Sequence, residues 1–280
     1  MKVSVIIPIY NEEKVILNCL KSLSKQTLAD FEIIFVDDGS TDSTLSILQG
    51  QTLQGKKLII FKQSHKGAGA ARNLGASQAR GDILVFVDAD MTLDKGFLKK
   101  LIEPITKGKI IGTFSKEEYL ENKDNPLAVA WNLNRRLPKD RMHPSNYPDQ
   151  QKVYRAILTK EFDKVGGFDE KAGYTDDYSL FDKLNVMAIN APGAIFYHKN
   201  PDTYREVFAQ SKWMAKRKYK LGILGTFIAL VRVSLPASLV LGILLALSYS
   251  LPAFLPFKII SDMGSFLGIM EYSLQAKVSK

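Results

Sequence analysis

Short apolar runs alternate with helix-like segments between residues 3 and 87, and this alternation constrains the fold more than any other feature. Repeated strand–helix–strand order is typical of a mostly parallel β-sheet covered by helices, so we predict an α/β fold. The expected strands are Val3–Ile7, Glu32–Val36, Leu58–Phe61 and Ile83–Val87. The expected helices begin near Glu12 with Asn11 as cap, near Asp42 with Ser40 or Thr41 as cap, and near Gly69, the last continuing through Ala79.

Acidic residues stand where two of these strands end. Asp37 and Asp38 follow the second strand, and Asp88 and Asp90 follow the fourth. Ligands of open parallel sheets bind in the crevice at the carboxyl ends of the strands. Carboxylates at the mouth of a buried strand cost solvation free energy unless a cation or a polar ligand is held there. We therefore expect the four acids to face one binding crevice.

The Asp88-Ala89-Asp90 motif offers hard oxygen ligands suited to Mg²⁺ or Mn²⁺, but too few to enclose the ion. Such an ion completes its shell with water and phosphate oxygens, which suits a reaction with a diphosphate leaving group. The alternative is that strand-terminal acids only cap the next helix, and the motif alone does not decide between the two.

Two loops carry candidate nucleotide contacts. Carboxylates in Asp37–Asp42 can accept hydrogen bonds from a uracil N–H or from ribose hydroxyls, although this run also forms a capped turn. The small residues of Gly67–Asn73 let a ligand approach the backbone, and Arg72 can reach a base or a phosphate. Because Gly67–Asn73 does not directly follow a strand, a Rossmann dehydrogenase is disfavoured, and no P-loop motif is present.

The C-terminal part contains an uncharged run from Val233 to Phe257. As one helix it would be about 37 Å long, enough to cross a hydrocarbon core of roughly 30 Å. We therefore predict one membrane span, with a second span or a surface helix over Leu221–Val231. The alternative is a buried hairpin in a soluble domain.

Basic residues gather just before this run, in a chain of 280 residues with net charge +9. Thr203–Lys220 has the pattern of an amphipathic helix for an anionic membrane surface rather than for nucleic acid. The positive-inside rule and the absence of a signal-peptide pattern predict a membrane protein whose catalytic domain is cytoplasmic. The basic cluster consists of Lys212, Lys216, Arg217, Lys218 and Lys220.

The segment from Lys116 to Gln150 is polar and interrupted by prolines, and we expect a substrate-facing insertion or a mobile loop. Order is expected to return with Val153–Leu158 and with a strand Ala194–Tyr197 that ends in His198. The single cysteine, Cys19, falls among apolar residues and is expected in the core.

Five motifs in this order resemble the glycosyltransferases of family 2, which have the GT-A fold. They cover about residues 1 to 200, and their combination is more specific than any one of them. The motifs are Val3–Asn11, Asp37–Asp42, Arg72-Asn73, Asp88-Ala89-Asp90 and Gly166-Gly167-Phe168-Asp169-Glu170.

The resemblance implies a metal-dependent, inverting transfer from a nucleotide-diphosphate sugar. It places Asp177 as the general base, which takes the proton of the acceptor hydroxyl. The family has a Glu-Asp pair here, and Asp176 replaces its glutamate, which puts a sugar or acceptor contact in doubt. A helix N-terminus is the other explanation for Asp176-Asp177. The implied nucleotide-sugar contacts are Pro8, Tyr10, Asp37, Asp38, Arg72, Asp88 and Asp176, and the implied metal ligands are Asp88, Asp90 and His198.

We predict that the chain moves a single sugar from a UDP- or GDP-sugar to a membrane-proximal acceptor, such as a polyprenyl phosphate or a lipid-linked glycan. Processive relatives carry a Gln-x-x-Arg-Trp motif, whereas Ala209 and Lys212 occupy its glutamine and arginine positions before Trp213. The alternatives are a nucleotidyltransferase and an inactive membrane-bound scaffold. The predicted domains are residues 1–202 (catalytic), 203–220 (basic juxtamembrane helix) and 221–280 (one or two spans).

Overall fold

The computed structural model describes the chain except for residues 54–55, 109, 145, 171–175, 218 and 279–280. It divides into two units: Met1–Tyr119 with Ser145–His198, and Leu120–Pro144 with Lys199–Lys280. This division differs from the three expected domains. Residues 120–144 group with the C-terminal helices, the last boundary follows His198 instead of residue 202, and residues 203–220 do not form a separate unit. Lys218, a member of the expected basic cluster, lies outside the described residues.

The first unit is built on a sheet of eight strands in the order β10-β12-β8-β11-β6-β1-β2-β5. Four neighbouring strands are parallel, as the sequence predicts: β6 (Ile83–Phe86), β1 (Val3–Ile9), β2 (Phe31–Asp37) and β5 (Ile59–Lys62). The others are β8 (Gly112–Phe114), β10 (Gln150–Gln151), β11 (Ala156–Leu158) and β12 (Ala188–Asn190), and β3 (Thr52–Leu53) pairs separately with β4 (Lys56–Lys57). The predicted α/β fold is confirmed.

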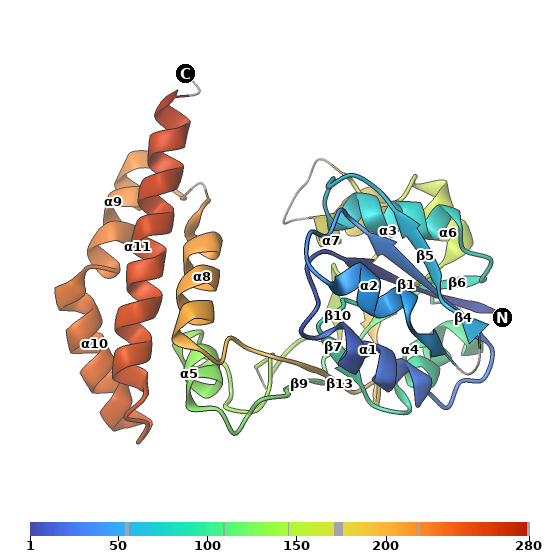
Figure 1. Cartoon of the computed structure of the whole chain (residues 1–280), viewed down its shortest axis with the longest axis horizontal. Helices are drawn as coiled ribbons and strands as arrows, with labels where there is room; N and C mark the ends of the chain where they lie inside the picture. The colour runs from blue at the N-terminus through green and yellow to red at the C-terminus, as the bar shows by residue number, and fades with distance from the viewer. Residues whose placement is uncertain (54–55, 109, 145, 171–175, 218, 279–280) are drawn as a thin grey trace. The chain divides into compact units, whose positions relative to one another are not determined.

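Helices cover both faces of this sheet (Figure 1). Alternate residues of β1 point to opposite faces, so Val5 and Ile7 pack in one apolar cluster while Ile6 packs in another. The first face carries α1 (Ile16–Ser24) and α4 (Phe97–Lys107), and the second carries α3 (Ala68–Ser77), α6 (Thr159–Lys164) and α7 (Asp176–Leu184). Cys19 lies in the first cluster, as expected.

Two predicted helix caps are wrong. Asn11 does not cap α1 but adopts a positive φ of 57° and accepts hydrogen bonds from the backbone N–H groups of Thr41 and Asp42. The helix α2 (Thr44–Gln49) starts later than Ser40 or Thr41, and Asp42 accepts the N–H of Thr44 at 2.9 Å. The side chain of Asn11 thus ties the end of β1 to the loop after β2.

A second, three-stranded sheet brings predicted site residues together. Its order is β7-β13-β9, formed by β7 (Met91–Leu93), β13 (Phe196–His198) and β9 (Glu118–Leu120). In the β7–β13 pair His198 lies opposite Met91, directly after Asp90. This pairing brings together two of the three predicted metal ligands, Asp90 and His198, although they are far apart in sequence.

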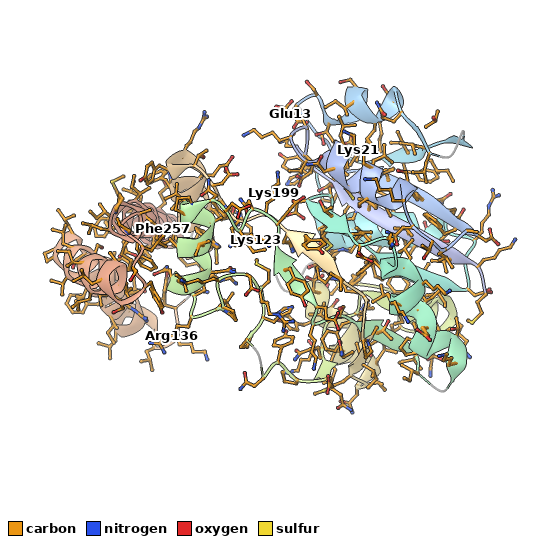
Figure 2. All side chains as sticks on the ribbon, turned by 90° about the horizontal axis from the view of Figure 1, so that it is seen from below. Glu13, Lys21, Lys123, Arg136, Lys199 and Phe257 are labelled. Atoms are coloured by element: carbon orange, nitrogen blue, oxygen red, sulfur yellow. The ribbon has the colours of Figure 1, made fainter. Side chains whose placement is uncertain are left out.

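The second unit is helical. Gly264 and Gly268 of α11 come so close to α8 that an added Cβ would lie 2.5 Å from the Phe208 carbonyl oxygen and 2.2 Å from that of Lys212. Figure 1 shows α8 and α10 alongside α11, and Phe257 is fully buried among these helices (Figure 2). The helices are α5 (Pro126–Asn134), α8 (Tyr204–Ala215), α9 (Gly222–Arg232), α10 (Leu235–Ser248) and α11 (Phe254–Val278).

The run from Val233 to Phe257 does not form one helix, so that prediction is wrong. Pro236 sits in the first turn of α10, where proline is tolerated, and Ser250 adopts a positive φ of 50° before α11 begins. The helix α10 would be only about 21 Å long. Among the described residues no single helix is long and apolar enough to cross a bilayer, whereas α9 and α10 together pass that test as a pair bent by 56°.

The prediction of a loop between Lys116 and Gln150 is also wrong in part, because this segment contains β9, α5 and the start of β10. The helix α5 begins with Asn125, whose side chain accepts hydrogen bonds from the N–H groups of Leu127 and Ala128, and Pro126 occupies its first turn. Leu127 and Trp131 of α5 pack in the apolar cluster of the second unit.

Candidate active site

The parallel strands place the predicted acids along one sheet edge. Asp38 is buried, and its carboxylate accepts the N–H groups of Lys66 at 2.8 Å and Gly67 at 2.9 Å, as well as the amide of Gln63 at 2.7 Å. The His65 ring also lies 2.9 Å from this carboxylate. Asp38 therefore fixes the loop that leads into α3, a role that the sequence did not indicate.

An aromatic pair lies beside this loop. Tyr10, which is 41% exposed, stacks on His65 with ring centroids 4.1 Å apart. Pro8 is paired with Val36 inside the sheet. Asp37 accepts the N–H of Ser40 at 3.1 Å and closes the turn at the end of β2. The predicted nucleotide contacts at this edge thus combine a flat aromatic surface with buried carboxylates.

Arg72 connects the two predicted halves of the site. Its guanidinium donates to Asp88 at 2.8 Å, to Asp177 at 3.0 Å and to Asp176 at 3.2 Å. Burial opposes the positive charge, but the three carboxylates outweigh it and raise the pKa of Arg72. Its Nε atom is buried without a hydrogen-bond partner among the residues that the structure describes. Arg72 therefore holds the strand-end acid and the proposed base in one ion network.

Asp88 has a second arginine that the sequence analysis missed. Arg155 donates from Nη1 to Oδ2 of Asp88 at 2.7 Å, and its guanidinium lies 5.7 Å from the centre of the Phe196 ring. Burial alone would raise the pKa of Asp88, but Arg155 and Arg72 hold it well below its usual range. Each oxygen of Asp88 thus accepts one arginine N–H, and a ribose hydroxyl or a metal ion would have to bind at the remaining lone pairs of a carboxylate whose side chain is 28% exposed.

The predicted ligands Asp90 and His198 are in direct contact. Nε2 of His198 lies 3.0 Å from Oδ1 of Asp90, and Nδ1 contacts Glu118, which the sequence analysis also missed. Burial lowers the pKa of His198, but hydrogen bonds to the two carboxylates outweigh this and raise it to about 10. The imidazole is therefore protonated at neutral pH.

A divalent ion fits this position only with ligands from a substrate. The Asp90 side chain is 46% exposed and can be reached by an ion, and an ion can displace the proton of His198 because metal binding and protonation compete. No group of three or more acidic, histidine or cysteine side chains in the described part of the chain is arranged to hold a metal. Phosphate oxygens and water would have to complete the shell.

Glu12 adds a further acid near this cluster. Burial and the neighbouring charges of Asp90, Asp88 and Asp42 raise its pKa to about 8. Its backbone N–H donates to Thr44 at 2.7 Å, which fixes the loop after β1. Burial is the larger of these causes, and a bound cation would relieve only the part that comes from the neighbouring carboxylates.

The proposed base is positioned by a glycine turn. Asn73 accepts the N–H of Phe168 at 2.9 Å and donates to the carbonyl oxygen of the same residue at 3.0 Å. Gly167 has a positive φ of 70°, and an added Cβ would lie 2.5 Å from Oδ1 of Asn73. Lys183 of α7 donates to the Gly167 carbonyl. These contacts hold the turn between α3 and α7.

The two acids at the start of α7 differ in exposure. Asp176 is buried, and a Cβ on Gly69 would lie 2.8 Å from its Oδ2, so a larger residue at position 69 would require the Asp176 carboxylate to move. Burial raises the pKa of Asp176. The Asp177 side chain is 41% exposed and binds Arg72 through Oδ1. Asp177 is therefore the acid of this pair that an acceptor can reach.

The sequence profile of glycosyl transferase family 2 matches residues 4–166, more than half of the chain. The chain belongs to this family. A curated family 2 relative, the uncharacterized glycosyltransferase EpsJ of Bacillus subtilis, is 30% identical over 220 residues, 73% of this chain and 63% of EpsJ. The poly(ribitol-phosphate) beta-glucosyltransferase of Bacillus spizizenii is 38% identical over 123 residues, 40% of this chain and 19% of that protein. The matches thus span less than two thirds of these relatives.

Solved structures show the same fold. The 1–349 fragment of TarS from Staphylococcus aureus, in complex with UDP, is 20% identical with a TM-score of 0.57, covering 99% of this chain and 92% of that one. The mannosyltransferase PcManGT from Pyrobaculum calidifontis, in complex with GDP-Man and Mn²⁺, is 19% identical with a TM-score of 0.57, covering 98% and 87%. At this identity the likeness establishes the fold alone.

Proposed function

We propose that this family 2 glycosyltransferase moves one sugar from a nucleotide-diphosphate sugar to an acceptor hydroxyl with inversion at the anomeric carbon. The observation that carries the proposal is the position of Arg72, which binds Asp88 at a strand end and Asp177 on α7 at the same time. The buried guanidinium of Arg72 thus holds the donor-side acid, Asp88, and the half-exposed base, Asp177, in the same site.

Solved neighbours support a nucleotide-sugar donor, because they are complexes with UDP, UDP-GlcNAc and GDP-Man. In this chain we assign the nucleotide to the edge formed by Pro8, Tyr10, Asp37 and Asp38. The exposed Tyr10 ring offers a face for a base. Asp38 holds the loop at Lys66 and Gly67, so it would shape this pocket as well as contact the nucleotide.

Asp177 acts as the general base in this proposal. Its carboxylate takes the proton of the acceptor hydroxyl, while the hydroxyl oxygen forms a bond to the anomeric carbon and the bond to the diphosphate oxygen breaks. Arg72 occupies one oxygen of Asp177 and fixes the side chain. An acceptor phosphate, as in a polyprenyl phosphate, is already ionised and needs no base. A general base at Asp177 therefore favours a hydroxyl acceptor, such as that of a lipid-linked glycan.

A divalent cation fits beside Asp90 and His198, where it would supply positive charge for the departing diphosphate. Asp90 and His198 would hold it, and Glu118 would orient His198 through Nδ1. A Mn²⁺ complex of one structural neighbour supports the same cofactor class.

We also assign the enzyme to the cytoplasmic side of a membrane, near its acceptor. The support for membrane contact comes from α9 and α10, where large apolar side chains are exposed, among them Ile223 at 91% and Leu247 at 74%. The cytoplasmic side rests on the basic cluster that precedes these helices in the sequence. Such exposed apolar surface is characteristic of protein or membrane interaction sites.

The test is donor turnover by the full chain with UDP- and GDP-sugars, with and without Mg²⁺ or Mn²⁺. Asp177→Asn should reduce kcat by at least about 100-fold, and Asp90→Ala should abolish the metal dependence. Asp182→Asn, an exposed acid on the same helix, should retain full activity. Full activity in the first two variants would overturn the proposal. Pyrophosphate release from a nucleoside triphosphate would indicate a nucleotidyltransferase, and failure to bind any sugar nucleotide would indicate an inactive scaffold.

A further inference from the structure

A pocket of about 660 Å³ lies entirely within the helical unit, between α5, α8, α9 and α11. This volume is in the range of small-molecule binding sites. Its walls include the apolar side chains of Trp131, Met214, Ile228 and Ile269. None of these residues belongs to the candidate active site.

The polar floor of this pocket is satisfied internally. Ser211 of α8 and Ser261 of α11 are buried and hydrogen-bonded to each other at 2.9 Å. Trp131 is buried edge-on against Phe257, with ring centroids 6.2 Å apart. The pocket therefore has a fixed, mostly apolar interior.

The mouth of the pocket is basic. None of its described lining residues is acidic, and no ion pair joins the four basic ones to an acid in the described part of the chain. Nearby acids are already neutralised: Glu271 binds Lys212 and Lys216, and Asp262 binds Lys258. The basic lining residues, all exposed, are Arg135, Arg217, Lys220 and Arg232.

Apolar surface continues outward from the pocket along α9. Ile228 lines the pocket and is 51% exposed, and Phe227 beside it is 62% exposed. A ligand that complements both features needs a compact anionic group for the basic mouth and a flexible apolar part for the walls and α9. Nucleic acid lacks the flexible apolar part.

We propose that this pocket binds the phosphate headgroup of an anionic membrane lipid, with the first part of the acyl chains against Met214 and α9. Arginine recognises phosphate through paired N–H donors, and two pocket arginines come from different helices, Arg232 from α9 and Arg135 from the end of α5. A lipid would thereby link α9, which has no buried residue of its own, to the rest of the helical unit.

The first experiment measures sedimentation of the full chain with vesicles of phosphatidylcholine alone or mixed with phosphatidylglycerol. Arg135→Gln/Arg232→Gln should weaken binding to the mixed vesicles roughly 30-fold. The matched control, Lys123→Gln/Arg205→Gln, removes the same charge from exposed positions of this unit that do not line the pocket (Lys123 is labelled in Figure 2). Equal weakening by both double variants would indicate diffuse charge attraction and would overturn the proposal that the pocket binds the lipid.

A second experiment separates a pocket from a surface. Thermal unfolding is followed with short-chain phosphatidylglycerol below its micelle concentration, with inorganic phosphate, and with a single-stranded oligonucleotide. Only the lipid should raise the Tm, and Ala229→Phe, which fills the pocket without changing its charge, should remove the rise. An equal rise with phosphate or oligonucleotide, or a rise retained in Ala229→Phe, would overturn the proposal. Neither readout requires turnover, so both are independent of the proposed enzymatic activity.

Discussion

Nη1 of Arg155 lies 2.7 Å from Oδ2 of Asp88, opposite the oxygen that Arg72 binds. Arg155 comes from the residue before β11, which runs antiparallel to β6 and so reaches the strand end that carries Asp88. The strand-end carboxylate is thus ionised and fixed before any ligand arrives. Its geometry depends on an arginine distant in sequence.

Replacing Arg155 by methionine should therefore destabilise the protein by about 2–4 kcal/mol, because Asp88 would keep its charge with one partner fewer. Urea unfolding measures this change. Arg80→Met is the control, since Arg80 is exposed and its side chain forms no ion pair within the described part of the chain. Equal unfolding midpoints for the two variants would contradict the assigned role.

The glycine turn offers a matched pair of substitutions. Gly166 and Gly167 have nearly the same positive φ, 69° and 70°, but only at Gly167 would a Cβ strike Asn73. Gly166→Ala should cost about 1 kcal/mol of stability from backbone strain alone. Gly167→Ala should cost roughly 2–3 kcal/mol and also lower kcat, because it displaces α7 and Asp177. Comparable losses in the two variants would show that Asn73 does not hold the turn.

His198 should make stability depend on pH. Its pKa rises from 6.5 to about 10 on folding, so its stabilising contribution is complete below pH 6.5 and is lost as the pH rises through 10. In the metal-free protein, NMR of the ring should show an imidazolium at pH 8. Glu118→Gln removes one of the two negative charges beside the ring and should lower the pKa of His198. A wild-type ring that titrates near 6.5 would contradict the arrangement.

The helical unit contains a buried ion pair that can be tested separately. Lys258 lies 2.7 Å from both oxygens of Asp262, which also accepts a hydrogen bond from Ser238 of α10. Lys258→Met should cost about 3 kcal/mol, whereas Lys258→Met/Asp262→Leu should cost less, because no charge is left unpaired. Lys100→Met breaks an exposed pair with Glu103 and should change stability by less than about 1 kcal/mol. A double variant less stable than the single one would be the contrary result.

The four parallel strands of the first unit could be predicted because their apolar β-branched runs end at polar turns, as in Val3–Ile9. The resemblance to the family implied that Asp90 and His198 bind the same metal ion, and the structure has these two side chains in contact. Arg155 and Glu118 could not be found in this way, because strand pairing between distant segments brings them to the site. The sequence Val153-Tyr154-Arg155-Ala156-Ile157, with one arginine in an apolar stretch, was the available signal.

Apolar composition was a poor guide to the C-terminal helices. The run from Val233 to Phe257 has the length of a span, yet its continuity depends on backbone dihedrals that composition does not encode. The chain turns at Ser250, and Pro252 precedes the next helix. Likewise, the prolines between Lys116 and Gln150 suggested a loop, whereas Pro126 occupies the helix position that proline favours.

The grouping of residues 120–144 with the C-terminal helices has a consequence for protein engineering. The chain leaves the sheet unit after Tyr119, returns to it, and leaves again after His198. Cutting the gene after His198 would therefore not release a self-contained catalytic fragment. The fragment would still contain α5 but would lack the helices on which α5 packs. Leu127 and Trp131 would lose Phe254 and Phe257 as packing partners and become exposed to water. Such a truncation should aggregate, whereas a fragment that also replaces 120–144 by a short polar linker would avoid this exposed apolar surface.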